Sequence, residues 1–273
     1  MLGLLKRWLQ RHTAGAAPLP DTLWQTTLVR YPFLAALPAA DRSRLRGLAQ
    51  QFIGQKEFHG ANGLVITDQI AVDIAAQACL PVLHLATGLA WYEDFVGIVV
   101  HPGEVLARRE YQDPAGVVHR YSEVITGEAM HRGPVMLSWQ DVAVAGDSAQ
   151  QGYNVVVHEF VHKLDMRDGE VDGCPPLPHG FMGHPAAAIA RTAWLGAMHA
   201  AYDRFREQVT IAQRFGGEPP WLNDYGAVSV VEFFAVACEA YFVNRPRFAA
   251  DFSDLLPLLD AFFRPGLPAP GSA

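Results

Sequence analysis

The stretch Val155–Asp165, VVVHEFVHKLD, places two histidines and a glutamate inside an otherwise apolar run. Positions four apart lie on one face of an α-helix, so His158 and His162 would present their imidazoles side by side. Glu159 follows the first histidine and would reach a water molecule bound to a metal held by that pair. Uncompensated imidazoles and a carboxylate are costly inside a buried helix, and a bound metal would offset that cost. The stretch therefore predicts a metal site on a buried helix.

This HExxH spacing is typical of zinc metallopeptidases, in which the two histidines bind the metal and the glutamate acts as general base. The helix is predicted to begin at Ser148, because Ser148 and Gln151 have the spacing of a capping box. No proline interrupts residues 149–166, so the helix is expected to cover that range.

A third protein ligand is expected, because a catalytic zinc site uses three side chains and leaves its fourth position to water. The longer pattern HExxHxxGxxH is absent, since Asp165 and Asp168 stand where its glycine and last histidine would be. A carboxylate from another helix is therefore the expected ligand. The apolar segment 224–242, DYGAVSVVEFFAVACEAYF, offers Glu232 and Glu239, which are seven residues apart and share a helix face. The spacing alone leaves the choice between them open.

The segments HEFVHKLD and YGAVSVVEFFAVACEAYF together resemble the Mlc titration factor A family of zinc peptidases. They are also similar to the catalytic domain of anthrax lethal factor, a gluzincin-like zinc peptidase. The resemblance takes in IAVDIAAQACLPVL and VGIVVHP, and so covers most of residues 20–260. In the family pattern a tyrosine stands seven residues before the glutamate that begins EFF, and Tyr225 and Glu232 share that spacing.

The resemblance implies that Glu232 is the third zinc ligand and that Tyr225 is a catalytic tyrosine near the metal. Glu239 would then support a ligand or the surrounding structure. The alternative for Tyr225 is an ordinary interface tyrosine. In the implied mechanism, Glu159 would accept a proton from the zinc-activated water, and Tyr225 would donate a hydrogen bond to the oxyanion.

The function that the resemblance implies is aminopeptidase activity on small peptide substrates, with one Zn²⁺ per chain. The family also implies an Mlc-like transcriptional repressor as a partner, and through it an effect on sugar phosphotransferase genes. Two other functions stay open. One is a repressor-binding module with a structural zinc and incidental peptidase activity, and the other is a zinc hydrolase that acts on non-peptide substrates.

Strand-like segments precede the helices along the chain, which favours an α+β fold. The resemblance implies a zincin-like fold with a small mixed or antiparallel sheet. Strands are predicted within 56–60, 64–67, 96–103 and 116–139, and helices over 41–53, 68–85, 185–213 and 229–244. Asp68 is the expected N-cap of the helix over 68–85, and Pro81 is expected to kink or end that helix. The last strand before the metal helix, GPVMLSWQ (133–140), is expected to be either an edge strand that pairs with an extended peptide or a core strand.

Residues 1–22 are predicted to form an N-terminal helix and arm, 23–263 the zincin-like peptidase domain, and 264–273 a disordered Pro/Gly-rich tail. A net charge of −7 without a Lys/Arg block argues against direct nucleic-acid binding. The apolar runs are too short to span a membrane, and three widely spaced cysteines indicate free thiols in a reducing compartment. We therefore expect a cytoplasmic protein. The Gly/Pro-rich stretch 168–184 follows the metal helix directly and is expected to gate the cleft.

Overall fold

The computed structural model of the chain describes residues 19–103, 105–112, 118–125 and 127–266. Within these ranges, helices surround a small sheet, which confirms the predicted α+β class. Most of the predicted N-terminal arm and of the C-terminal tail lies outside the described residues, so the division into arm, domain and tail stays a prediction. Among the residues that the structure describes, none of the helices combines the length and the apolar composition that a membrane span requires.

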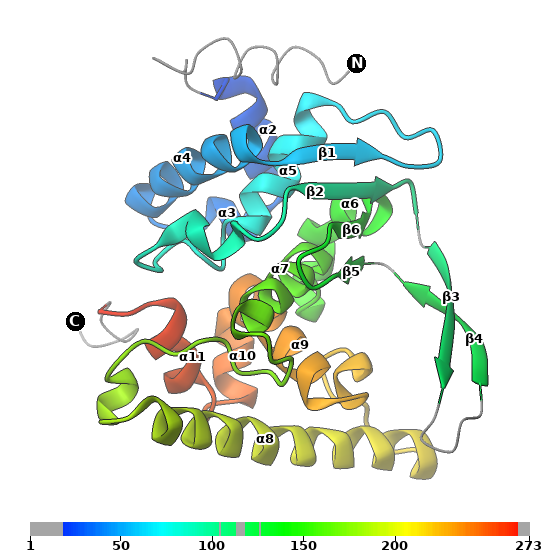
Figure 1. Ribbon diagram of the computed structural model, residues 1–273, viewed down its shortest axis with the longest axis vertical. Helices are drawn as coiled ribbons and strands as arrows, with labels where there is room; N and C mark the ends of the chain where they lie inside the picture. The colour runs from blue at the N-terminus through cyan, green and yellow to red at the C-terminus, as the bar shows by residue number, and fades with distance from the viewer. Residues whose placement is uncertain (1–18, 104, 113–117, 126, 267–273) are drawn as a thin grey trace.

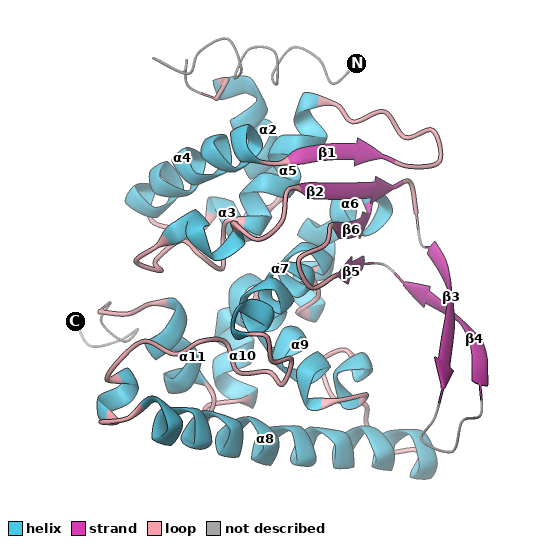
Figure 2. Ribbon diagram, viewed as in Figure 1, coloured by secondary structure: helices cyan, strands magenta, loops and turns pink. Residues whose placement is uncertain are grey.

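Figure 1 shows the order of the elements, and Figure 2 separates helices from strands. The helices are α2 (Asp21–Arg30), α3 (Pro32–Ala35), α4 (Ala39–Gln55), α5 (Asp68–Ala78), α6 (Trp139–Ser148), α7 (Val155–Asp165), α8 (Ala187–Phe215), α9 (Val230–Val243), α10 (Arg245–Asp251) and α11 (Leu256–Phe263). The strands are β1 (Glu57–Gly60), β2 (Gly97–His101), β3 (Val105–Gln112), β4 (Val118–Ile125), β5 (Gly127–Ala129) and β6 (Val135–Ser138).

The main sheet has four strands in the order β1-β2-β6-β5. Strands β1, β2 and β6 are parallel, whereas β5 runs antiparallel to β6. Strands β3 and β4 form a separate antiparallel hairpin. Of the two alternatives predicted for 133–140, the structure has the core strand and not the edge strand, because β6 lies between β2 and β5. A turn at Met130–Gly133 folds β5 back onto β6, and β5 therefore becomes the edge.

The predicted strand at 64–67 is also wrong, because the chain reverses before it. Leu64 N donates to Ala61 O at 3.0 Å, which makes a turn directly after β1. Thr67 then serves as the N-cap of α5 and accepts a hydrogen bond from Ile70 N at 3.2 Å. The cap predicted at Asp68 is therefore one residue late. Helix α5 ends at Ala78, before residue 85, and Pro81 lies just beyond this end and does not kink the helix.

Helix α7 begins at Val155, and the start predicted at Ser148 is wrong. Ser148 ends α6, and a short 3₁₀ helix follows that stops at Gly152, whose φ of 75° is left-handed. The N-cap of α7 is Asn154, whose side chain accepts a hydrogen bond from Val157 N at 2.9 Å. Ser148 Oγ instead donates to Tyr153 O at 3.0 Å, inside the turn that reorients the chain.

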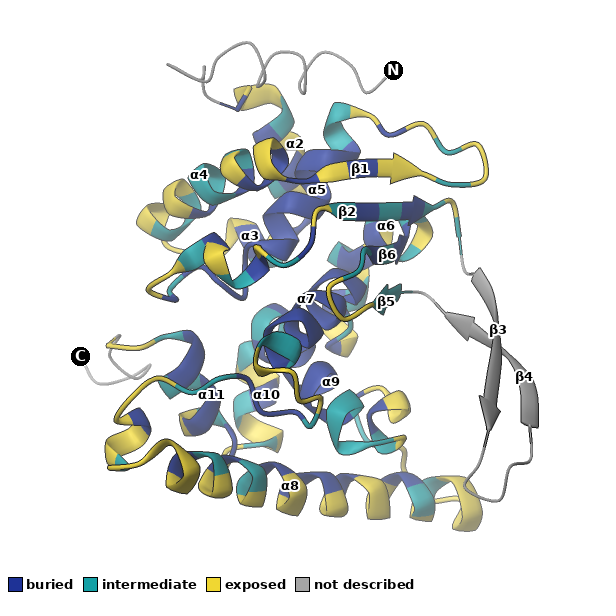
Figure 3. Ribbon diagram, in the orientation of Figure 1, coloured by how far each residue is buried: buried dark blue, intermediate teal, exposed yellow. Residues whose placement is uncertain are grey.

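Helix α7 lies at the centre of the molecule, and every one of its residues is buried. It packs against α5, against β5 and β6 of the sheet, and against α9 on the C-terminal side. Figure 3 shows α7 and most of α9 as buried ribbon between the sheet and the outer helix α8. Polar groups on α7 are therefore held inside the core, where each must have a partner or incur a large desolvation cost.

Candidate metal centre

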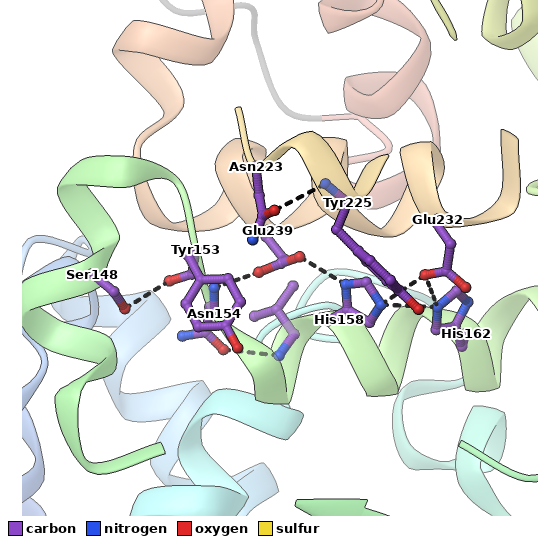
Figure 4. A network of polar contacts seen from close by, with 10 residues as sticks. Ser148, Tyr153, Asn154, His158, His162, Asn223, Tyr225, Glu232 and Glu239 are labelled. Carbon is purple, nitrogen blue, oxygen red and sulfur yellow. Dashed lines mark hydrogen bonds and ion pairs between the residues drawn. The ribbon is translucent and has the colours of Figure 1, made fainter. Parts of the chain in front are cut away.

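Two helices bring three potential ligands together. His158 and His162 lie one turn apart on α7, with ring centroids 4.7 Å apart. Glu232 lies in the first turn of α9, where its backbone N–H donates to the N-cap Ser229 at 3.2 Å. Glu232 Oε2 is 3.0 Å from His158 Nε2 and 3.3 Å from His162 Nε2, and the two Nε2 atoms are 3.1 Å apart. Figure 4 shows the three groups converging.

These separations fit one tetrahedral metal ion. Zinc ligands at about 2.0–2.1 Å from the metal stand about 3.3 Å from one another in a tetrahedron, close to the distances in this cluster. The chemistry of the donors points the same way. If Nδ1 of His158 carries the proton and donates it to Glu239, Nε2 of His158 is an acceptor. This Nε2 then faces Nε2 of His162 and Oε2 of Glu232. A cation at the shared point would satisfy all three.

The electrostatics of the cluster favour positive charge between these groups. Burial opposes a charge on His158, but hydrogen bonds with Glu232 and Glu239 outweigh it and raise the histidine's pKa well above its usual value. Burial also favours a neutral Glu232, but hydrogen bonds with His158 and His162 hold the pKa of that carboxyl far below its usual range. The same carboxylates could balance a divalent cation.

Glu239 contacts His158 at the ring nitrogen that faces away from Glu232 and His162. Its Oε1 lies 2.7 Å from Nδ1 of His158, and its Oε2 accepts a hydrogen bond from the backbone N–H of Asn154. The side chain of Asn154 in turn donates to Gln77 Oε1 at 2.7 Å. The structure thus distinguishes the two glutamates between which the sequence left the choice open. Glu232 faces Nε2 of both histidines, whereas Glu239 faces Nδ1 of His158. Asn154 therefore caps α7 and also links it to α5 and α9.

Glu159 lines a cavity of about 210 Å³ beside the cluster. Its side chain is almost fully buried, and burial raises its pKa to about 8, an effect that His158 opposes and Glu232 reinforces. Strand β5 forms another wall of this cavity. The contribution of β5 was not predicted, because a strand of three residues is too short to show an alternating pattern.

Tyr225 lines the same cavity from the short 3₁₀ helix that precedes α9. Its ring centroid lies 6.0 Å from that of His158, and 41% of the residue is exposed. Figure 4 shows its side chain directed toward the two histidines. The backbone of Tyr225 is fixed by Asn223, whose side chain accepts its N–H at 3.0 Å. All five residues expected at the site therefore lie around one cavity.

Asp165 ties the end of α7 to the stretch 168–184. Its Oδ2 accepts the N–H of Gly173 at 3.0 Å, and Trp194 Nε1 donates to Gly173 O at 2.7 Å. Asp165 Oδ1 and Nδ1 of His162 are both buried and have no hydrogen-bond partner in the described part of the chain. Val171 of the same stretch lines the cavity. Gating by 168–184 stays a prediction, and the hydrogen bonds of Gly173 to Asp165 and Trp194 hold one point of that stretch in place.

Comparison with known proteins identifies the family. The model of the glucose-regulated metallopeptidase M90 family matches residues 5–264, which is nearly the whole chain. The chain belongs to this family. M90 membership makes it a metallopeptidase-like protein and implies a metal ion, for which the His158–His162–Glu232 cluster is the candidate site.

Relatives of this M90 protein carry the name Mlc titration factor A. The protein from Cronobacter sakazakii is 31% identical over 249 residues, which cover 91% of this chain and 86% of the relative. The protein from Serratia proteamaculans is 35% identical over 237 residues, 86% of this chain and 84% of the relative. The protein from Edwardsiella ictaluri is 36% identical over 221 residues, 81% and 78% of the two chains. The family resemblance expected from the sequence is thereby confirmed.

Proposed function

We propose that this M90 protein is a zinc-dependent peptidase of the gluzincin type, with a zincin-like fold. Its zinc ligands would be His158, His162 and Glu232. The observation that carries the proposal is the set of three separations of 3.0 to 3.3 Å among their facing atoms. A buried glutamate that borders the cavity directly beside this cluster distinguishes a catalytic site from a structural one, which would not need a general base.

In the proposed mechanism, Glu159, Tyr225 and Glu239 have separate roles in peptide hydrolysis. A zinc ion supplies Lewis acidity and lowers the pKa of a coordinated water when it is bound there. Glu159 takes a proton from the attacking water and passes it to the leaving amine. Tyr225 donates a hydrogen bond to the oxygen of the scissile carbonyl as negative charge develops on it. Glu239 holds the ring of His158 in the orientation that its role as ligand requires.

Substrate binding involves β5 in this proposal, in place of the strand that the sequence suggested. Met130 N donates to Pro134 O at 3.3 Å, so by antiparallel alternation Glu128 bonds to β6. Gly127 and Ala129 then direct their backbone N–H and C=O groups to the open edge. An extended peptide can pair with them next to Glu159. The small cavity suits short substrates, which supports aminopeptidase activity in this proposal. The cytoplasm expected from the sequence remains the proposed location.

A second candidate function rests on the name of the relatives, Mlc titration factor A. We propose that this chain also binds a transcriptional repressor of the Mlc type and so affects sugar phosphotransferase genes. In the alternative to the peptidase proposal, repressor binding is the only function of the chain. The zinc is then structural, and any peptidase activity is incidental.

One experiment separates the two. Zinc-loaded wild type and Glu159→Gln are assayed on a panel of aminoacyl-nitroanilides, and metal content is measured in both. We expect the variant to keep its zinc and to lose turnover by about 10²–10⁴-fold, the range that a general base contributes. If both proteins bind zinc and neither hydrolyses any substrate, the peptidase proposal fails. Equal binding of an Mlc-type repressor by both proteins would then favour the binding module.

A further inference from the structure

Strand β5 places a glycine directly against the side chain of Glu159. A Cβ atom at Gly127 would lie 2.4 Å from Glu159 Oε1 and 2.7 Å from its Cγ and Cδ. Such contacts are far below van der Waals distance, so the space for a side chain at position 127 is already taken by the carboxylate of Glu159. Gly127 does not have a left-handed φ. Any larger residue at position 127 would therefore need the Glu159 side chain to shift, although the backbone conformation would accept it.

The position of β5 is fixed from two sides, so the strand cannot easily withdraw. Gly127 pairs with Leu137 of β6 in the antiparallel register. Lys163 lies one turn after Glu159 on α7 and donates to Met130 O and, at 2.8 Å, to Gly133 O. One face of α7 thus contacts both ends of the β5–β6 hairpin, with Glu159 at the strand and Lys163 at the turn.

Glu159 is also carried by a buried backbone. It is only 4% exposed, and its helix is buried along its whole length. A side chain at position 127 would therefore push the carboxylate of Glu159 out of its present position, because both backbones are held in place.

We propose that Gly127 is a positioning residue for Glu159. The bare backbone of β5 forms one wall of the slot that holds the Glu159 carboxylate beside the ligand cluster. The consequence for turnover rests on the proposed function, in which Glu159 is the general base. The steric coupling between Gly127 and Glu159 does not rest on the proposed function, and it can be measured in a protein that has no enzymatic activity.

The kinetic test compares zinc-loaded wild type with Gly127→Ala in the full chain. We expect kcat to fall about 100-fold, as a misplaced catalytic group does, while zinc affinity stays unchanged. Gly97→Ala on β2 is the matched control, because a Cβ there meets Pro134 Cβ at an ordinary 3.4 Å, and it should keep its turnover. An unchanged kcat in Gly127→Ala, or a rise in KM alone, would overturn the positioning role.

The second test is a double-mutant cycle in thermal stability with Glu159→Ala, which removes the atoms that a Cβ at position 127 would meet. Gly127→Ala should lower the Tm by about 2–4 °C in wild type and by less than about 1 °C in the Glu159→Ala background. Equal shifts in both backgrounds would refute the contact. If the cycle shows coupling but zinc-loaded wild type hydrolyses no peptide, the positioning of Glu159 stands and the proposed peptidase function fails.

Discussion

Glu239 Oε1 lies 2.7 Å from Nδ1 of His158, on the side of the ring opposite to Glu232. Two carboxylates seven residues apart on α9 therefore face the two nitrogens of a single imidazole. A carboxylate at Nδ1 selects the tautomer in which Nε2 carries the lone pair, and it fixes the plane of the ring. This pair makes α9 responsible both for a proposed ligand and for the orientation of another.

Glu239→Ala should weaken zinc binding by about 10–100-fold, the usual effect of removing a group that orients a metal-bound histidine. Glu239→Gln should weaken it less, because the amide oxygen can still accept the N–H of His158. Competition with a chromophoric chelator measures both affinities. Wild-type affinity in Glu239→Ala would show that the contact does not orient the ligand.

Asn154→Ala should lower the free energy of unfolding by about 1–2 kcal/mol, because the variant loses the N-cap of α7. The loss of the buried hydrogen bond to Gln77 acts in the same direction. Ser148→Ala is the matched control: its hydroxyl bonds to Tyr153 O outside α7, so its effect should be smaller. Urea denaturation of the zinc-free proteins measures both. A larger effect at Ser148 would contradict the assigned helix start.

Tyr225→Phe should lower kcat on a small peptide substrate by about 10²–10³-fold if the hydroxyl stabilises the oxyanion. The aromatic ring remains in the variant, so zinc affinity and Tm should match those of wild type. Steady-state kinetics with equal metal loading checks this. Unchanged kcat with a higher KM would assign Tyr225 to substrate contact only.

The lowered pKa of Lys56 should make the free energy of unfolding depend on pH. Lys56 is buried, its ammonium donates to Phe95 O at 2.6 Å, and burial lowers its pKa to about 8. Nearby Asp94 and Cys79 raise this pKa, and Lys163 lowers it. Because the unfolded chain holds the proton more tightly, the charged lysine destabilises the fold below about pH 8. This penalty disappears as pH rises toward the unfolded pKa of about 10.4.

The stability of wild type relative to Lys56→Met should therefore rise between pH 8 and about 10.4, by up to about 3 kcal/mol. Groups that do not interact with Lys56 titrate in both proteins and cancel in the comparison, whereas Asp94, Lys163 and Cys79 are coupled to Lys56 and contribute to the difference. Urea denaturation of the two proteins at several pH values gives the difference. A difference independent of pH would show that the pKa of Lys56 is the same in the folded and unfolded chains.

Predictions of the fold succeeded where a long periodic pattern specified an element and failed at ends and edges. Helices α4, α8 and α9 lie within a few residues of their predicted ranges. The start of α7 was wrong because Ser148–Gln151 fits a capping box equally well in isolation, and only the left-handed Gly152 ends the preceding helical segment. The sequence left 133–140 open between an edge strand and a core strand, because strand order depends on pairing between distant segments, which a local pattern does not encode.

The sequence by itself determined that His158 and His162 share one helix face, because their i, i+4 spacing fixes that face in any α-helix. It also indicated that a carboxylate from a later helix must come to that face. Only the tertiary structure decided that Glu232 faces both histidines and that Glu239 lies behind His158. That outcome depends on how α9 packs against α7. The same packing set β5, and with it Gly127, against Glu159, since contacts between elements follow from the shape of the whole core.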